Sequence, residues 1–124
     1  MKKILLDTCI LIDYFRGKEN AVSYLENLPC TPYLSAASIA ELYAGVREGK
    51  ERHLLDTLVR YWQIIPLSTE IAQAGGQYRR DYFKSSGVGL IDGIIAATAI
   101  REKATLVTVN IKHFPMVELL VRPY

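Results

Sequence analysis

The sequence predicts an α/β fold in which helices cover both faces of a mainly parallel sheet. Short apolar runs, such as residues 3–6 and 106–109, alternate along the chain with longer segments of helical periodicity. Strands that crossover helices bury on both faces are continuously apolar, as these runs are. With 124 residues, of which 50% are hydrophobic and 23% charged, the chain has the size and composition of one globular domain, residues 1–124.

Residues that start or stop helices set the predicted boundaries of the elements. Gly17 and Pro29 each end a helix, and Ser35 and Ser68 can each cap the first turn of one. In the helix after Ser68, the pair Gly75–Gly76 costs about 1 kcal/mol per glycine relative to alanine. The predicted helices cover residues 8–15, 19–27, 35–48, 51–61, 68–84 and 90–103. The predicted strands cover residues 3–6, 33–34, 64–66 and 106–109, with an edge strand at 117–121.

Four oxygen-bearing side chains stand at the edges of these core segments. Asp7 and Asn110 each follow a predicted strand, at the sheet edge where the ligands of parallel sheets gather. Glu41 and Asp92 lie in predicted helices, on faces that otherwise carry alanine and glycine and so leave room for a ligand. Stability alone rarely places an acid beside a core segment. The four side chains are therefore predicted to converge on a cation.

Three converging carboxylates would repel one another, and the pKa of at least one would rise until it took up a proton. A divalent cation removes that repulsion, and Mg²⁺ suits a site of few carboxylates completed by an amide oxygen or waters. Such an ion can polarise a phosphodiester and lower the pKa of an attacking water, while a second ion can stabilise the leaving oxygen. The pattern thus predicts hydrolysis of a phosphate ester.

Composition argues against several other classes of protein. A net charge of +2 allows a nucleic-acid partner without demanding one. Cys9 and Cys30 are too few for a disulfide framework and lack zinc-binding spacing, so both are predicted to be reduced core thiols in a cytoplasmic protein. Asp7 and Asp13 interrupt the apolar start, which argues against a signal peptide, and no segment approaches the roughly 18 apolar residues of a membrane span.

Four segments carry a resemblance to a known family. They are ILLDTCILID (4–13), LSAASIAEL (34–42), LIDGIIAATA (90–99) and VTVNIKHF (107–114). In this order they resemble the four motifs of the PIN-domain family, and most of all those of the VapC toxin ribonucleases of toxin–antitoxin pairs. The resemblance implies a three-layer α/β/α sandwich, a homodimer, Mg²⁺- or Mn²⁺-dependent endoribonuclease activity, and a cognate VapB-like antitoxin that inserts into the acidic groove.

Carried over residue by residue, the resemblance also implies a site. The family's three acids fall on Asp7, Glu41 and Asp92, which would be catalytic residues and metal ligands. Its fourth acidic position falls on Asn110, whose amide is a weaker ligand and so weakens the expectation of a second tightly held metal. Polar side chains around the site fall on Thr8, Ser38 and Thr108.

Four basic residues are candidates for contact with RNA. Arg16 and Lys112 lie close in sequence to the acidic motifs. Arg79 and Arg80 belong to residues 78–84, where cations mix with aromatic side chains that could meet phosphates and unstacked bases. A charged helix flank with core aromatics explains residues 78–84 equally well.

Each polar residue also has a purely structural interpretation. Asp7 could cap the helix that follows it, a role worth about 1 kcal/mol, and Asp92 could complement a helix dipole for about 0.3–1 kcal/mol. Asp13 is predicted to pair with Arg16, three residues later. His113 is predicted to pack or hydrogen-bond beside an aromatic ring, outside the catalytic set.

Two other functions remain open on the sequence alone. A phosphotransfer domain would also place an Asp after its first strand, but it would want a second Asp where Cys9 stands. A PIN-like module that binds RNA or assembles without catalysis is favoured only by Asn110, the one departure from the four-acid pattern.

Overall fold

A computed structural model of the chain describes residues 2–124 and contains every helix and strand that the sequence predicts. Five short strands form one sheet in the order β3-β2-β1-β4-β5, and every neighbouring pair is parallel. The predicted fold class is therefore confirmed. In chain order the elements are β1 (Ile4–Leu6), α1 (Thr8–Phe15), α2 (Glu19–Glu26), β2 (Tyr33–Ser35), α3 (Ala36–Gly45), α4 (Lys50–Tyr61), β3 (Gln63–Ile65), α5 (Thr69–Ser86), α6 (Leu90–Glu102), β4 (Thr105–Val107), the 3₁₀ turn Ile111–His113, and β5 (Leu120–Val121).

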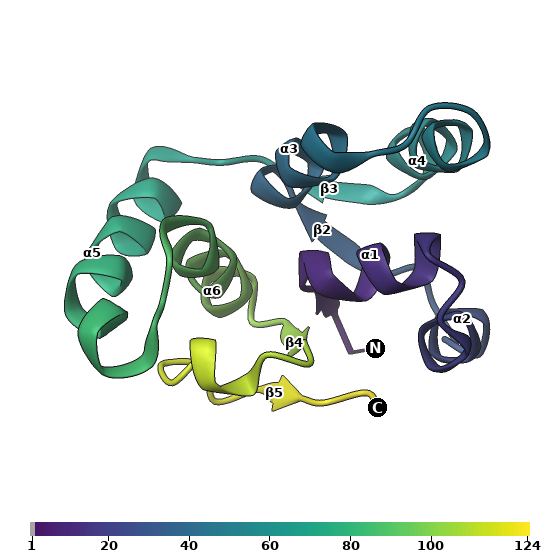
Figure 1. The fold of residues 1–124 in the computed structure, drawn as a ribbon. Coiled ribbons are helices and arrows are strands. Elements are labelled where there is room, and N and C mark those ends of the chain that lie inside the picture. The colour runs from purple at the N-terminus through teal and green to yellow at the C-terminus, as the bar shows by residue number, and fades with distance from the viewer. Residues whose placement is uncertain (1) are drawn as a thin grey trace.

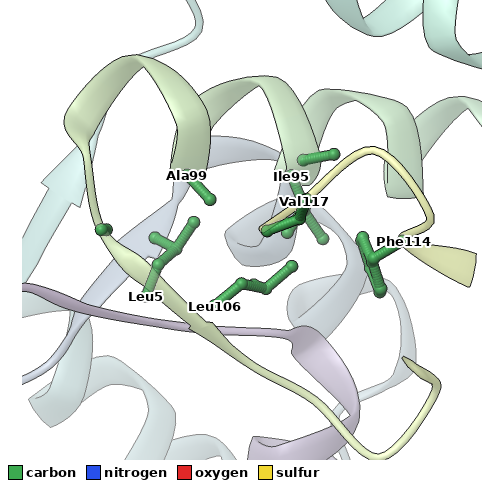
Figure 2. Packing of buried hydrophobic residues seen from close by; sticks show 8 residues of the cluster. Leu5, Ile95, Ala99, Leu106, Phe114 and Val117 are labelled. Carbon is green, nitrogen blue, oxygen red and sulfur yellow. The ribbon is translucent and has the colours of Figure 1, made fainter. Parts of the chain in front are cut away.

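The alternation of side chains along the strands divides the core between two faces of the sheet. Leu5 and Leu106 point to the face covered by α6, where they pack with Ile95, as Figure 2 shows. Leu6 and Val107, the next residue of each strand, pack instead with buried side chains of α1, α3 and α4. Figure 1 shows the result: α5 and α6 lie together on one side of the strands, and α1 and α2 lie on the other.

The two helices on one side approach each other through glycine. A Cβ atom built on Gly93 of α6 would overlap the carbonyl oxygen of Gly75 in α5, and a Cβ on Gly75 would lie 2.8 Å from the Ile94 side chain. The helix propensity lost at Gly75 is therefore the cost of a close backbone contact. No close contact requires glycine at position 76, because a Cβ there would meet no atom of the described chain within 4 Å.

Two predicted boundaries near the acidic residues are wrong. The helix after Ser35 ends at Gly45 rather than at residue 48, because Val46 adopts extended backbone with φ −67° and ψ 139°. β4 ends at Val107 rather than at residue 109, and Thr108 is the first residue after it. The Thr108 side-chain oxygen accepts a 2.9 Å hydrogen bond from Asn110 N, which turns the chain away from the sheet.

Asp13 is structural, as predicted, but its predicted partner is wrong. Its carboxylate accepts a 2.7 Å hydrogen bond from the hydroxyl of Tyr124 and lies 3.7 Å from Lys18 Nζ. No ion pair between Asp13 and Arg16 is present in the described chain. The contact instead ties the C-terminal residue to α1.

Between residues 2 and 124, no single helix is long and apolar enough to cross a membrane, although α5 and α6, bent by 118° at the break between them, pass that test as a pair.

Candidate functional site

The sheet order brings together the ends of two strands that are far apart in the sequence. β1 and β4 are neighbours, with Leu6 level with Val107, so Asp7 and Thr108 leave the sheet side by side at its carboxyl edge. The Thr108 hydroxyl donates a 2.7 Å hydrogen bond to Asp7 Oδ2. The connection from β1 leads to β2 on one side, while β4 pairs on the other. Ligands of open α/β sheets bind at such a switch point.

Asp7 is a buried carboxylate, only 4% exposed. Besides the Thr108 bond, Oδ1 accepts a 2.8 Å hydrogen bond from Thr8 N, and Oδ2 accepts a 3.3 Å bond from the Cys9 thiol. Burial raises the pKa of Asp7, and the charge of Asp92 raises it further, whereas these three hydrogen bonds lower it. Asp7 does cap α1, but a helix cap alone requires neither this burial nor a second acid nearby.

Asp92 lies in the first turn of α6, the helix that packs against Leu5 and Leu106 of the sheet. Its Oδ2 accepts a 3.2 Å hydrogen bond from Gly89 N, at the start of the helix, and lies 3.4 Å from His113 Nδ1. The side chain is 27% exposed, so it can still reach a ligand. Because its charge affects the pKa of Asp7, the two carboxylates share one electrostatic environment. This pair is the centre of the candidate site.

Glu41 joins the site through a hydroxyl. It is an exposed residue of α3, and its Oε1 accepts a 2.6 Å hydrogen bond from Thr8 Oγ1. The same Thr8 hydroxyl is hydrogen-bonded to Ser38 Oγ at 3.0 Å, and both of these side chains are buried. The chain Glu41–Thr8–Asp7 therefore connects the first turn of α1 to α3. Thr8 and Ser38, which are predicted to support the site, both lie in this chain of contacts, and Thr108 contacts Asp7.

Cys9 and His113 contact the acids, although the sequence predicts neither of them in the site. Cys9 is half-buried, and its thiol also lies 3.7 Å from Thr108 Oγ1. Burial, and then the charge of Asp7, raises the pKa of Cys9 to about 12, so it remains a protonated donor. The only sequence signal for the two residues is their position, Cys9 two residues after Asp7 and His113 inside the last motif.

The other predicted site residues lie at varying distances from the acids. Asn110 is exposed, and it is linked to Asp7 through its backbone N–H and Thr108. Arg16 lines a hollow of about 50 Å³ together with Glu41. Lys112 lies two residues after Asn110, and both residues line another hollow.

The two arginines predicted on α5 have their own partners. The Arg79 guanidinium lies 3.8 Å from the centre of the Phe83 ring, and Arg80 Nε lies 3.2 Å from the carboxylate of Asp81. These contacts fit the alternative of a charged helix flank, but Phe83 is exposed and is not one of the core aromatics that this alternative expects.

The acids do not form a ready-made metal cluster. Across residues 2–124, no three Asp, Glu, His or Cys side chains are grouped closely enough to hold an ion. Asp7, Asp92 and Glu41 each turn an oxygen to a hydrogen-bond donor of the protein instead, which limits their mutual repulsion. Mg²⁺ needs only one or two carboxylates and keeps several waters, so the oxygen donors of Asp7 and Asp92 fit it.

Both the sequence and the fold of this chain match those of known proteins. The PIN domain model matches residues 4–117. Ribonuclease VapC19 of Mycobacterium tuberculosis is 39% identical, over 97% of this chain and 98% of the relative, and Ribonuclease VapC10 of the same organism is 35% identical, over 98% and 92%. A toxin–antitoxin complex from Klebsiella pneumoniae contains a chain that is 31% identical, with a TM-score of 0.83 and 98% coverage of both chains.

The chain therefore belongs to the PIN-domain family. Within that family it is a VapC-like protein, as the order of the four motifs led us to expect.

Proposed function

We propose that this protein is a metal-dependent endoribonuclease and the toxin of a toxin–antitoxin pair. The observation that carries the proposal is the buried carboxylate of Asp7, whose pKa is raised by burial and by the charge of Asp92. Two acids held this way at a switch point attract a cation more readily than they stabilise a fold. The similarity to proteins named ribonuclease supports RNA as the substrate.

We infer that Asp7 and Asp92 hold Mg²⁺ or Mn²⁺, with Glu41 and the amide oxygen of Asn110 completing the site. When bound, the ion polarises the phosphodiester and lowers the pKa of an attacking water. The hydrogen bonds from Thr108, Cys9 and Thr8 N fix the Asp7 carboxylate in one orientation.

The other two acids are oriented in the same manner. Gly89 N donates a hydrogen bond to the carboxylate of Asp92, which the His113 imidazole also approaches, and the Thr8 hydroxyl donates to that of Glu41. The partners of Asp7, Asp92 and Glu41 come from three separate parts of the chain: the first turn of α1, the residue before α6, and the loop after β4. We propose that these contacts, rather than a preformed cluster, prepare the acids for the ion.

We also propose a cognate antitoxin and a homodimer in the cytoplasm. The solved relative from Klebsiella pneumoniae is described as a toxin–antitoxin complex, which supports the antitoxin. A cationic side chain of the antitoxin, most simply an arginine, can pair with Asp7 and Asp92 where the metal or the phosphate would bind. Purification of the chain with and without the product of the neighbouring gene tests this. Absence of a complex would count against it.

The test of activity is cleavage of a mixed pool of transfer and ribosomal RNA. The purified chain is incubated with Mg²⁺, Mn²⁺ or EDTA beside the Asp92→Asn variant. Cleavage that needs metal and disappears in the variant supports the proposal, and the fragments identify the target. Binding of Mn²⁺ and RNA without cleavage would instead assign a non-catalytic RNA-binding module. Full cleavage by Asp92→Asn, after a contaminating nuclease has been excluded, would refute the site.

A further inference from the structure

A hollow lined by basic side chains opens next to the acidic pair. It has a volume of about 380 Å³, and we call it the basic hollow. Among residues 2–124, its lining contains two permanent cations and no acidic residue. The lining residues are Val109, Asn110, Ile111, Lys112, His113 and Arg122.

The two cations of the basic hollow are not neutralised by the protein. Lys112 and Arg122 are exposed, and within residues 2–124 neither has a carboxylate within 4.0 Å. In contrast, Arg52 and Lys3 each form ion pairs with a neighbouring carboxylate, at 3.0 and 2.9 Å respectively. The charges of Lys112 and Arg122 are therefore available to an anionic ligand.

One imidazole joins the basic hollow to the acids. His113 lines the hollow and also places Nδ1 3.4 Å from Asp92 Oδ2. Asn110 lines it as well, and its N–H is bonded to the Thr108 hydroxyl that contacts Asp7. His113 and Asn110, both on the segment after β4, therefore connect the basic hollow to the acidic pair.

We propose that the basic hollow binds a phosphate of the RNA strand next to the one that is cleaved. The inference rests on the proposed ribonuclease function and adds to it the place where the neighbouring phosphate of the RNA binds. Arg122 can hold two phosphate oxygens with its planar guanidinium, and Lys112 adds a compact charge. The exposed Asn110 amide can hydrogen-bond the sugar.

A polynucleotide fits this arrangement better than an acidic peptide does. Its phosphates repeat along the strand, so one can meet the acidic pair through a cation while its neighbour meets Lys112 and Arg122. An acidic peptide could also pair with Lys112 and Arg122, but it has no phosphodiester to meet the acidic pair through a cation.

The experiment measures binding of a short fluorescent single-stranded RNA in EDTA by anisotropy, at several salt concentrations. All proteins carry Asp92→Asn, which prevents cleavage. Lys112→Gln and Arg122→Gln are compared with Arg60→Gln, which removes the same charge from the last turn of α4, before the amino end of β3. Each hollow variant should bind more weakly, and its slope of log K against log salt should fall by about 0.7 per lost phosphate contact. Arg60→Gln should leave the slope unchanged.

The same substitutions in the cleavage-competent chain separate this inference from the proposed function. The lost phosphate contact stabilises bound RNA equally before and during cleavage. Its loss should therefore raise KM for the RNA and change kcat little. If the original chain cleaves RNA but the hollow variants keep its salt slope and KM, the inference is wrong and the ribonuclease proposal stands. A loss of antitoxin binding with unchanged RNA binding would also overturn it. If the original chain neither binds nor cleaves RNA, both proposals fail.

Discussion

The Thr108 hydroxyl donates a 2.7 Å hydrogen bond to Asp7 Oδ2, although the two residues are 101 positions apart in the chain. The bond exists because β1 and β4 are neighbours and end at the same level. The same hydroxyl oxygen accepts the N–H of Asn110. A single buried side chain therefore fixes the orientation of the central acid and the path of the loop that leads to the basic hollow.

Replacement of Thr108 by valine keeps the volume of the side chain and removes both hydrogen bonds. Thr108 is fully buried, so Asp7 and the Asn110 N–H lose a partner that water cannot replace. We expect a loss of about 1–3 kcal/mol in the free energy of unfolding. Activity should fall about 10- to 100-fold, as for other residues that orient metal ligands. Urea denaturation and the RNA cleavage assay measure the two effects.

Thr108→Ser is the matched control, because it retains the hydroxyl and loses only a methyl group. It should keep most of the activity that Thr108→Val loses. Equal activity in the two variants would show that the hydroxyl does not orient Asp7.

Asp7→Asn should abolish cleavage while the protein gains stability at high pH relative to the original chain. Burial raises the pKa of Asp7, so the folded state favours the neutral acid. The stability contributed by Asp7 is fully present below its ordinary pKa of 3.8 and is lost as pH rises through the raised value. Asparagine carries no charge and avoids this loss. Its amide can donate to the oxygen of Thr108, since a hydroxyl both donates and accepts.

The measurement is urea denaturation of both proteins in EDTA between pH 4 and pH 8. As pH rises, the free energy of unfolding of Asp7→Asn should increase relative to that of the original chain, and the difference should then become constant. A difference that does not change with pH would mean that burial does not raise the pKa of Asp7.

The sequence allowed the sheet and the helices to be predicted, and Asp7 to be placed directly after β1, because these features depend on local patterns. The apolar runs define β1 and β4, and Ser35 and Ser68 cap α3 and α5 as expected, each accepting a hydrogen bond from a backbone N–H of the first turn. The acids Asp7 and Asp92 stand in motifs whose order identifies the family.

What the sequence could not predict depends on contacts between distant segments. The bond between Thr108 and Asp7 and the approach of His113 to Asp92 need the folded positions of β1, α6 and the loop after β4. The basic hollow likewise combines Lys112 with Arg122, which lie ten residues apart on either side of β5. No local pattern marks such a pair.

Cys9 should resist alkylation in the folded protein. A pKa raised from 9.0 to about 12 lowers its thiolate fraction at pH 8 by roughly a thousandfold, and only the thiolate is nucleophilic. Iodoacetamide at pH 8 should therefore label the half-buried Cys30 well before Cys9, as read by mass spectrometry of peptides. The rate at Cys9 should continue to rise up to pH 10 without a plateau.

Unfolding in urea removes burial and the charge of Asp7, so both cysteines should then react at similar rates. Labelling of Cys9 as fast as Cys30 in the folded protein would mean that its thiol is not held as a donor to Asp7.

Gly93→Ala should destabilise the protein, whereas Gly76→Ala should stabilise it. The new Cβ of Gly93→Ala would overlap the Gly75 carbonyl oxygen, so α5 and α6 must separate, at a cost of about 1–3 kcal/mol or more. The Cβ of Gly76→Ala meets nothing within 4 Å, and the change should gain up to about 1 kcal/mol of helix propensity. Urea denaturation of the two variants gives both values. Since Asp92 precedes Gly93 in α6, Gly93→Ala should also reduce cleavage, and equal stability of the two variants would contradict the close contact of these helices.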